Sequence, residues 1–405
     1  METEISVERA VELITGSVQP LGVEEIPATQ AHRRVLAAPV RAPIDQPPWP
    51  RSPLDGYALH AADSALASRE TPAVLRVTDT IYAGGWSGEA VGSGECVRLM
   101  TGAPIPAGCD CVIRQEDTDV GTEQVQIFKS LRPWENYCFP GEDFKKGDIL
   151  LAAGTRLSGN ALGILASAGL LREEVSLPVC RVPRCALLCT GDELVPNTLH
   201  PLPPGKIYSS NEAVLCARLR ELGMEVASVR SAFDDAAALA AEIREAMKIA
   251  DMVLTTGGVS VGAKDILHET LPLLGAERLL WRVALKPGSP LMYSLYEQKP
   301  ILSLSGNPFA ASATFELFAR PLFAQLAGAA DLALQVFPAV LDTPFQKHSG
   351  VRRFVRGVFC GGHVTLPEGH SSGLLRSAAG TNCLAEIPAD AGPLPAGCTI
   401  TVYLL

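Results

Sequence analysis

The chain lacks paired cysteines, long apolar runs and an excess of positive charge. No two of its eleven cysteines are separated by two residues, and none is grouped with the seven histidines at the spacing of a zinc site. We therefore interpret the cysteines as small buried apolar side chains in a reducing compartment. The net charge of −10 argues against broad nucleic-acid binding, which requires a basic stripe.

Signals that direct a chain to a membrane are also lacking. The first residues, Met-Glu-Thr-Glu-Ile-Ser, have neither the basic nor the apolar region of a signal peptide. The most apolar stretch, residues 161–171, is shorter than the roughly 20 residues that span a bilayer. We therefore expect a cytoplasmic protein without membrane contacts. A Walker loop and a GxGxxG fingerprint are absent, so the sequence indicates neither a nucleotide triphosphatase nor a dehydrogenase.

Length and local pattern divide the chain into several parts. Its 405 residues exceed one ordinary core. Residues 7–36 have a helical pattern. Residues 42–140 are rich in Pro, Gly and β-branched side chains, with strand candidates at 73–77 and 124–128. From about residue 332 onward, alternating strands such as 399–403 predict a small β-barrel or sandwich.

Residues 179–326 alternate between apolar runs and amphipathic stretches, which predicts an open, mainly parallel α/β sheet with helices on both faces. Residues 185–190 form a continuous apolar run, as expected of a fully buried parallel strand. Asn211 and Asp235 stand where they can cap helices. The other predicted strands are 226–229, 252–256 and 301–305.

Carboxylates follow three different strands of this predicted sheet. They are Glu193, Asp234 and Asp265. Ligands of such sheets bind beyond the carboxyl ends of the strands, and carboxylate oxygens are good ligands for Mg²⁺. The sequence therefore predicts a magnesium site, while the alternative is that Asp234 is solvated and Asp235 is only a helix cap.

Groups that can bind an anion are predicted at the same edge. The turn at Gly257 and Gly258 lets the backbone come close to a ligand. Asn307 as N-cap, with Pro308 at the first helical position, opens a long helix, and helix N-termini attract phosphate. Lys286 adds a positive charge on the same side. One glycine-rich turn is weak evidence, but several at one edge predict a ligand site.

Three loops in the N-terminal part carry further polar groups. Asp55 follows Ser-Pro-Leu, Thr101 precedes Gly-Ala-Pro, and Asp143 ends a Gly-Glu-Asp sequence. Composition alone predicts a turn at each of the three.

Taken together, these motifs resemble those of the molybdopterin molybdenumtransferase family, which includes the C-terminal half of gephyrin. The resemblance covers nearly the whole chain, with seven motifs in family order. They are Asp55-Gly56-Tyr57-Ala58, Met100-Thr101-Gly102-Ala103-Pro104, Gly141-Glu142-Asp143, Thr190-Gly191-Asp192-Glu193-Leu194, Gly257-Gly258-Val259-Ser260-Val261-Gly262, Lys286-Pro287-Gly288 and Gly306-Asn307-Pro308.

The resemblance implies a subunit of four domains. These are a linking domain at 1–41 and 140–178, an inserted β-rich domain at 42–139, an α/β molybdopterin-binding domain at 179–328 and a C-terminal β-barrel at 329–405. It also implies a homodimer, with each active site between the α/β domain of one subunit and N-terminal loops of the other.

The resemblance further implies a reaction and the residues that perform it. Molybdate is inserted into adenylyl-molybdopterin, which yields the molybdenum cofactor and AMP. Molybdopterin adenylyltransferase and apo-molybdoenzymes are possible partners. The catalytic positions are Asp55, Thr101, Asp143, Glu193, Asp234 and Asp265, of which the last three hold Mg²⁺. The substrate-binding positions are Gly257, Gly258, Ser260, Gly262, Lys286, Gly306, Asn307, Pro308, Arg356 and Ser372, and the last two handle the oxyanion.

Several positions depart from the family pattern. Ser289 stands where the family usually has a second Lys, and Ala310 where it commonly has Ser. Both fall where the family binds the oxyanion, and the loss of one cation there costs about a few kcal/mol unless other residues compensate. The remaining departures are Ser209 for an Asp, Ser305 for a Pro, a missing Arg at 136–138 and a missing His at 371–373.

These departures leave two alternatives open. One is a diverged paralogue that uses tungstate. The other is a non-catalytic protein that stores or delivers the finished cofactor. The retained carboxylates favour the enzyme, because a storage protein has little need for a carboxylate cluster beside a bound pyrophosphate.

Overall fold

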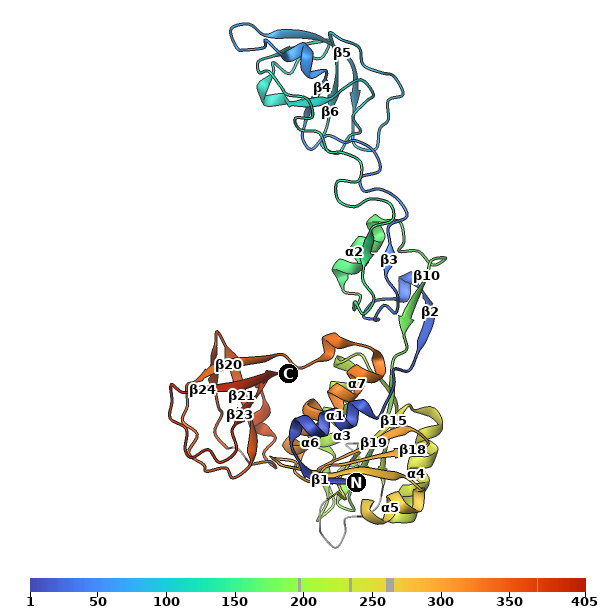
Figure 1. Cartoon of the computed structure of the whole chain (residues 1–405), viewed down its shortest axis with the longest axis vertical. Helices are drawn as coiled ribbons and strands as arrows, with labels where there is room; N and C mark the ends of the chain where they lie inside the picture. Colours follow the sequence, from blue (N-terminus) through green and yellow to red (C-terminus); the bar gives the residue numbers. More distant parts are fainter. Residues whose placement is uncertain (196–197, 233–234, 260–265, 370) are drawn as a thin grey trace.

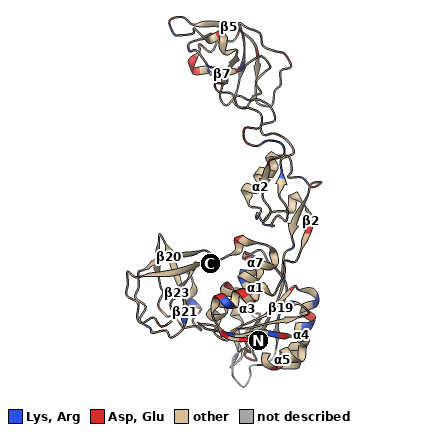
Figure 2. Cartoon of the chain, in the orientation of Figure 1, with Lys and Arg blue, Asp and Glu red and all other residues tan. Residues whose placement is uncertain are grey.

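The computed structural model describes residues 1–195, 198–232, 235–259, 266–369 and 371–405. The molecule is elongated, with a central α/β body and a small barrel at one end, a middle segment, and a β-rich segment at the far end (Figure 1). Acidic and basic residues are interspersed along all of these parts (Figure 2). Among the described residues, no helix combines the length and apolar character needed to cross a membrane.

The central body is built on a seven-stranded sheet, in the order β1-β16-β18-β19-β15-β11-β14. The four strands β19, β15, β11 and β14 are parallel neighbours, and β18 pairs antiparallel with β16 and β19. This confirms the predicted mainly parallel α/β sheet. The strands are β1 (Glu2–Ile5), β11 (Arg184–Thr190), β14 (Glu225–Ala232), β15 (Met252–Thr256), β16 (Glu277–Val283), β18 (Met292–Tyr296) and β19 (Lys299–Leu304).

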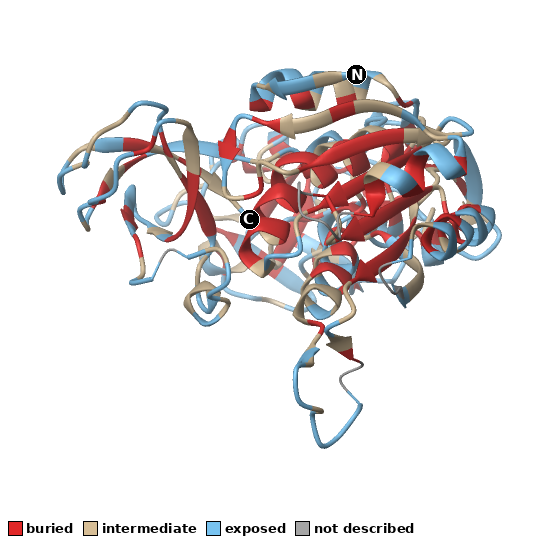
Figure 3. Ribbon diagram, turned by 90° about the horizontal axis from the view of Figure 1, so that it is seen from below, coloured by how far each residue is buried: buried red, intermediate tan, exposed pale blue. Residues whose placement is uncertain are grey.

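Helices cover both faces of this sheet, as predicted. One face packs against α1 (Val7–Gly16), α3 (Ser210–Glu221) and a continuous helical segment formed by α6 (Pro308–Thr314), the π-helix η4 (Phe315–Ala319) and α7 (Arg320–Ala327). The other face packs against α4 (Ala236–Ile249) and α5 (Leu267–Leu274). The central strands are buried while the outer faces of the helices are exposed (Figure 3).

The alternation of side chains along β11 explains why both faces need cover. Leu187 belongs to the apolar cluster on one face, and Ala186 and Leu188 belong to the cluster on the other. All three are fully buried. Successive side chains of a strand point to opposite faces, so a continuous apolar run requires packing on both sides. The predicted buried strand at 185–190 is thereby confirmed.

Two predictions about helices are wrong. The helical pattern of residues 7–36 ends at Gly16, because Pro20 and Gly22 follow, and residues 23–27 form strand β2 (Val23–Pro27), which pairs with β10 (Ser176–Cys180). Asn211 does not cap α3: the N-cap is Ser209, and Asn211 lies inside the first turn. Asp235 does cap α4, since its Oδ1 accepts a hydrogen bond from the amide of Ala238 at 2.6 Å.

The C-terminal strands form a closed barrel. Their order is β21-β22-β20-β24-β23, and β23 pairs again with β21, which closes the sheet on itself. The sequence predicted either a small barrel or a sandwich, and the closed sheet confirms the barrel. The strands are β20 (Val336–Leu341), β21 (Arg352–Cys360), β22 (His363–Thr365), β23 (Cys383–Ile387) and β24 (Thr399–Leu404), and β17 (Leu285–Lys286) adds to the edge of β21.

The barrel is joined to the central body by shared apolar core and by one arginine. Phe354 and Leu384 of the barrel belong to the same cluster as α1 and α7. Arg352 donates to Glu386 and to the hydroxyl of Tyr403, both at 2.8 Å, and forms an ion pair with Glu8 of α1. These contacts fix β21 relative to the central sheet.

The N-terminal part forms two smaller units. The middle segment contains the β2–β10 pair, the β3–β9 pair and α2; the far segment is a five-stranded sheet in the order β7-β4-β6-β5-β8, which includes both predicted strand candidates. The four domain boundaries stay predictions. The elements are β3 (Val40–Arg41), β4 (Gly56–Leu59), β5 (Ala73–Ile81), β6 (Glu95–Leu99), β7 (Cys111–Arg114), β8 (Gln124–Ile127), β9 (Ile149–Leu151) and α2 (Gly159–Ser167).

Most of the cysteines are core residues. All eleven are free, and seven of them are buried. Burial raises the pKa of the Cys96 and Cys109 thiols to about 12, which keeps them protonated and unreactive at neutral pH. The seven buried cysteines agree with the interpretation as small buried apolar side chains, whereas Cys360 is exposed and three others are partly buried.

Replacement of a fully buried residue in a central strand should destabilise the central sheet. We expect Leu187→Ala in β11 to lower the local free energy of unfolding by about 2–5 kcal/mol, because it leaves a cavity at a fully buried position. Hydrogen exchange of peptides from β11 and β15 measures this change. The control is Leu273→Ala, whose side chain in α5 is 59% exposed and should leave exchange nearly unchanged. Unaltered protection of β11 in Leu187→Ala would contradict the packing described.

Candidate functional site

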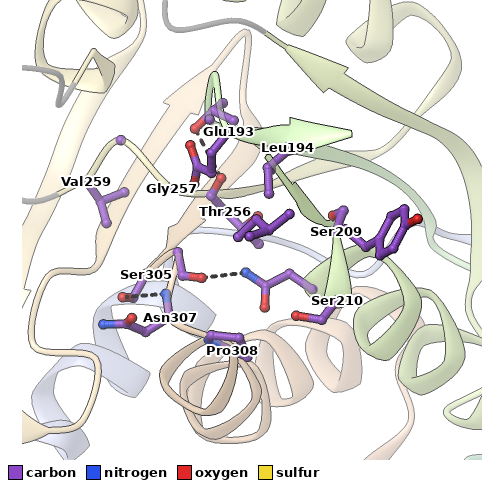
Figure 4. A pocket seen from close by; sticks show the side chains of 17 residues that line it. Glu193, Leu194, Ser209, Ser210, Thr256, Gly257, Val259, Ser305, Asn307 and Pro308 are labelled. Carbon is purple, nitrogen blue, oxygen red and sulfur yellow. Dashed lines mark hydrogen bonds between the residues drawn. The ribbon is translucent and has the colours of Figure 1, made fainter. Parts of the chain in front are cut away.

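A cavity of about 500 Å³ lies at the carboxyl ends of the central strands. It is lined by the loops that follow β11, β15 and β19 and by the residues that open α3. Figure 4 shows Glu193 and Gly257 on one side of the cavity and Asn307 and Pro308 on the opposite side. Four predicted loop positions, Glu193, Gly257, Asn307 and Pro308, therefore meet in one place.

Strand register brings these loops together. Cys189 of β11 is paired with Thr256 of β15, and Thr256 is paired with Leu304 of β19. All three strands are parallel, so the chain leaves the sheet at the same edge each time. The residues directly after the strands then share one surface, where ligands of doubly wound sheets bind.

Gly257 must be glycine for this edge to form. It has a φ of +92°, and a Cβ there would lie 2.6 Å from the carbonyl oxygen of Thr190 and 2.7 Å from its hydroxyl oxygen. The Thr190 hydroxyl donates to the carbonyl of Thr256 at 3.1 Å, so it cannot move aside freely. The two loops thus approach each other more closely than any side chain would permit.

Glu193 supplies the negative charge of the cavity. Its carboxylate lies over Gly191, where a Cβ would stand 2.6 Å from one of its oxygens. Among the described lining residues Glu193 is the one carboxylate, and none is Lys or Arg. The residues that the structure describes contain no group of three His, Cys, Asp or Glu side chains able to hold a metal. The other two predicted metal ligands, Asp234 and Asp265, lie outside the described residues, as do Ser260 and Gly262.

The first turn of α3 contributes residues that the sequence interpretation did not assign to the site. Ser209, Ser210 and Asn211 line the cavity, as does Thr256 at the end of β15. Asn211 Nδ2 donates to the carbonyl of Gly306 at 2.8 Å, so it ties α3 to the loop before α6 instead of capping a helix. The run of polar residues before α3 and the departure at Ser209 are the signals that could have revealed the three residues at the start of α3, whereas Thr256 is the last residue of a strand and gave no signal of its own.

The loop before α6 presents backbone groups to the cavity. Asn307 is the N-cap residue and Pro308 takes the first helical position, as predicted, although the Asn307 side chain makes no capping bond. The hydroxyl of Ser305 accepts a hydrogen bond from the amide of Asn307 at 3.4 Å. Gly258 and Gly306 also line the cavity.

The two predicted oxyanion residues, Arg356 and Ser372, contact Phe309, which directly follows the cavity-lining Pro308. Arg356 is on β21, and its guanidinium carbon lies 4.1 Å from the centre of the Phe309 ring in the first turn of α6. The carbonyl of Ser372 accepts a hydrogen bond from the amide of Phe309 at 3.0 Å. Lys286 is exposed on β17 and lies opposite Arg353 in the parallel pairing of β17 with β21. Arg356, Ser372 and Lys286 are not among the lining residues.

Asp55 and Thr101 form a pair in the far β-rich segment. One oxygen of Asp55 accepts hydrogen bonds from the amide of Thr101 at 2.7 Å and from its hydroxyl at 2.8 Å. The bond from the Thr101 amide has the largest effect and the bond from its hydroxyl the next largest, and together they hold the pKa of Asp55 below its ordinary value. Asp143 is exposed, and its amide donates to the carbonyl of Gln46 at 2.9 Å. Within one chain, this segment lies at the opposite end from the cavity (Figure 1).

Comparison with family models covers most of the chain. The model described as the MoeA N-terminal region (domain I and II) matches residues 5–169. That of the probable molybdopterin binding domain matches residues 186–325, and that of the MoeA C-terminal region (domain IV) matches residues 338–405.

Full-length relatives and solved structures agree with these matches. Molybdopterin molybdenumtransferases of Staphylococcus aureus (strain COL) and Bacillus subtilis (strain 168) are 33% and 34% identical to this chain; the alignments cover 99% and 100% of it, and 95% and 94% of the relatives. Two crystal structures of the molybdopterin biosynthesis MoeA protein from Pyrococcus horikoshii match 99% of this chain and 98% and 100% of their own, with TM-scores of 0.83 and 0.85 at 29% and 26% identity. The resemblance carried by the seven motifs is thereby confirmed, and the chain belongs to the molybdopterin molybdenumtransferase family.

Proposed function

We propose that this protein is a transferase of molybdenum-cofactor biosynthesis that inserts molybdenum into molybdopterin. The substrates are adenylyl-molybdopterin and molybdate, and the products are the molybdenum cofactor and AMP. The observation that carries the proposal is the cavity in which Glu193, Gly257 and Asn307 meet, because these residues belong to three family motifs far apart in the chain.

The composition of the cavity wall suits a phosphate-bearing ligand only together with a cation. Its described residues offer hydroxyl, amide and backbone groups but no Lys or Arg. A pyrophosphate bridge placed there would keep most of its negative charge beside the Glu193 carboxylate. A divalent cation held by Glu193 would offset this repulsion, which supports a requirement for Mg²⁺.

Glu193, with Asp234 and Asp265, would hold that cation. When bound, Mg²⁺ neutralises and polarises the pyrophosphate bridge, so that AMP is a better leaving group. The glycine turn at Gly257 and Gly258 and the loop at Gly306 and Asn307 line the cavity and would position the phosphate groups by their close approach. Orientation of the two reactants supplies much of the rate gain in such a transfer.

The oxyanion site is proposed at the boundary with the barrel. Lys286, Arg356 and the Ser372 hydroxyl would recruit molybdate through charge-assisted hydrogen bonds. Pairing of β17 with β21 keeps Lys286 on the strand next to Arg356. Arg356 and Ser372 both contact Phe309, and Phe309 directly follows Pro308 of the cavity wall.

We further propose that two copies of the chain complete each active site. Asp55 and Thr101 make a preorganised pair, yet they lie at the opposite end of the molecule from the cavity (Figure 1). An antiparallel homodimer lets the far segment of one copy reach the cavity of the other. The eleven free thiols suit the reducing cytoplasm, where molybdopterin adenylyltransferase would supply the substrate and apo-molybdoenzymes would take the product.

Tungstate is the second candidate substrate. At the oxyanion site, Ser289 replaces the Lys that the family usually has, and Ala310 replaces the Ser. Ala310 is 1% exposed, so solvent does not replace the missing hydroxyl. A coupled assay with purified protein, adenylyl-molybdopterin, Mg²⁺ and either oxyanion separates the candidates. We expect AMP release with molybdate. Turnover with tungstate alone would favour the diverged paralogue, and tight pterin binding without AMP release would favour a delivery protein.

Loss of the Glu193 charge should weaken the response to magnesium. We expect Glu193→Gln to raise the Mg²⁺ concentration needed for half-maximal AMP release by roughly 10- to 100-fold, because the cation loses a carboxylate ligand. The matched control is Glu297→Gln, which removes an exposed carboxylate at the turn between β18 and β19, at the other end of β19. Equal Mg²⁺ dependence of Glu193→Gln and wild type would remove Glu193 from the metal site.

Removal of the Thr101 hydroxyl should raise the pKa of Asp55. Thr101→Val deletes the hydrogen bond from the hydroxyl and keeps the one from the amide, so the charged form of Asp55 loses part of its stabilisation. Carboxyl ¹³C NMR measures the upward shift, and the acidic limb of the activity profile should move to higher pH with it. Thr101→Ser keeps the hydroxyl and should behave as wild type. An unchanged pKa in Thr101→Val would show that the hydroxyl contributes nothing.

A further inference from the structure

A second hollow, a groove of about 490 Å³, lies in the far β-rich segment. Aromatic rings and prolines make up much of its wall, which includes Trp86, Trp134, Tyr137, Pro50, Pro104 and Pro106. Among the described residues that line it, Glu89 is the one that carries a charge. The groove therefore suits an apolar occupant and not a phosphate or another small anion.

The largest rings of this groove are exposed. Trp86 is 71% exposed and Trp134 is 54% exposed. The ring centres of Trp86 and Trp49 are 6.1 Å apart, and those of Trp134 and Tyr137 are 5.1 Å apart, so three of the four tryptophans of the chain gather at one surface. Exposed apolar surface of this kind marks an interaction site, and Trp and Tyr are common anchors of protein interfaces.

The groove is built from the chain segments that also carry Asp55 and Thr101. Pro50 and Ile105 both line it, and the amide of Ile105 donates to the carbonyl of Pro50 at 2.9 Å. Pro50 precedes Asp55 by five residues and Ile105 follows Thr101 by four, while the Thr101 hydroxyl donates to Asp55 at 2.8 Å. A second copy that meets the Asp55–Thr101 pair therefore lies next to the groove.

The rim of the cavity carries a loop whose chemistry fits such a groove. Residues 198–206, Thr-Leu-His-Pro-Leu-Pro-Pro-Gly-Lys, directly precede Ile207 and Tyr208, which line the cavity. Leu199 and Leu202 are both exposed. The hydroxyl of Tyr208 donates to the carbonyl of Leu199 at 3.0 Å, which ties this loop to the cavity wall. Proline-rich segments bind grooves lined by aromatic rings, because their extended backbone has little freedom left to lose.

We propose that the groove of one copy binds the loop at residues 198–206 of a second copy, and that this contact holds the far segment over the cavity. The inference rests on the proposed two-copy active site and names the surfaces that would join it. Within one chain the far segment and the cavity lie at opposite ends of the molecule (Figure 1), so the groove is out of reach of its own loop. In a twofold dimer the contact forms twice, since each copy brings one groove and one loop.

The dimer dissociation constant of the full-length protein, measured by sedimentation velocity, tests this contact. We expect Trp86→Ala and Leu202→Ala each to raise it roughly 10- to 100-fold, because each removes an apolar anchor from both contacts of the dimer. The melting temperature of the far segment should change little in Trp86→Ala, since this side chain is mostly exposed. The matched controls are Leu66→Ala in the far segment and Leu273→Ala in α5, two exposed leucines outside the groove and the loop, which should leave the constant unchanged.

A double substitution shows whether the two side chains meet. Trp86→Ala combined with Leu202→Ala should weaken the dimer by less than the product of the two separate effects, because either change alone already removes the contact. Since the two residues lie far apart within one chain, such coupling can arise only between copies. Multiplicative losses, a wild-type dissociation constant in either single variant, or a monomeric wild type would overturn the contact.

Activity distinguishes this contact from the proposed function. AMP release by Trp86→Ala should fall at low protein concentration and recover as the concentration is raised, because mass action restores the dimer. Failure of the wild type to release AMP at any concentration would overturn the proposed function, and the sedimentation result would still decide the contact. AMP release by Trp86→Ala that equals wild type at every concentration would contradict the role of the contact in holding the far segment over the cavity.

Discussion

The cavity depends on the parallel alignment of β11, β15 and β19. Pairing of Cys189 with Thr256, and of Thr256 with Leu304, makes all three strands end at one edge. Loops that carry Glu193, Gly257 and Asn307 then meet although more than a hundred residues separate the first from the last. A shift of one strand by a single residue would turn its apolar side chains to the opposite face, so packing of helices on both faces fixes the register and thereby the site.

Charge is divided between two parts of the molecule. The described wall of the cavity carries a carboxylate and no Lys or Arg, whereas the buried Arg356 of the barrel contacts Phe309, which directly follows the wall residue Pro308. In the proposed function, the cation and the oxyanion would therefore be held by different groups, Glu193 and Arg356, which do not form an ion pair with each other in the described structure. The barrel is held against the central body by Arg352, which forms an ion pair with Glu8 of α1 and donates hydrogen bonds to Glu386 and Tyr403 of the barrel.

Local sequence signals succeeded where neighbours along the chain decide the conformation. The apolar run at 185–190 is a buried strand, Asp235 caps α4, and Asn307-Pro308 begins α6. They failed where distant residues decide it. The helical pattern of residues 7–36 is interrupted after Gly16 by Pro20 and Gly22, and residues 23–27 then form a strand whose partner, Ser176–Cys180, is distant in the chain. β1 lies at the edge of the central sheet beside β16, a partner nearly 280 residues away that no local pattern could indicate.

The family, the order of α/β and β-rich parts and the motif residues can be identified from the sequence, because glycine turns, caps and apolar periodicity are local properties. Which motifs share a surface depends on the tertiary structure. In the folded chain, Glu193, Gly257 and Asn307 line one cavity, and Asp55 lies with Thr101 at the far end. Asn211, predicted to cap a helix, donates a hydrogen bond to the carbonyl of Gly306. Arg356 stacks on Phe309, a contact between a barrel strand and a helix of the central body. Such contacts arise from strand register and packing between layers, which depend on the whole chain at once.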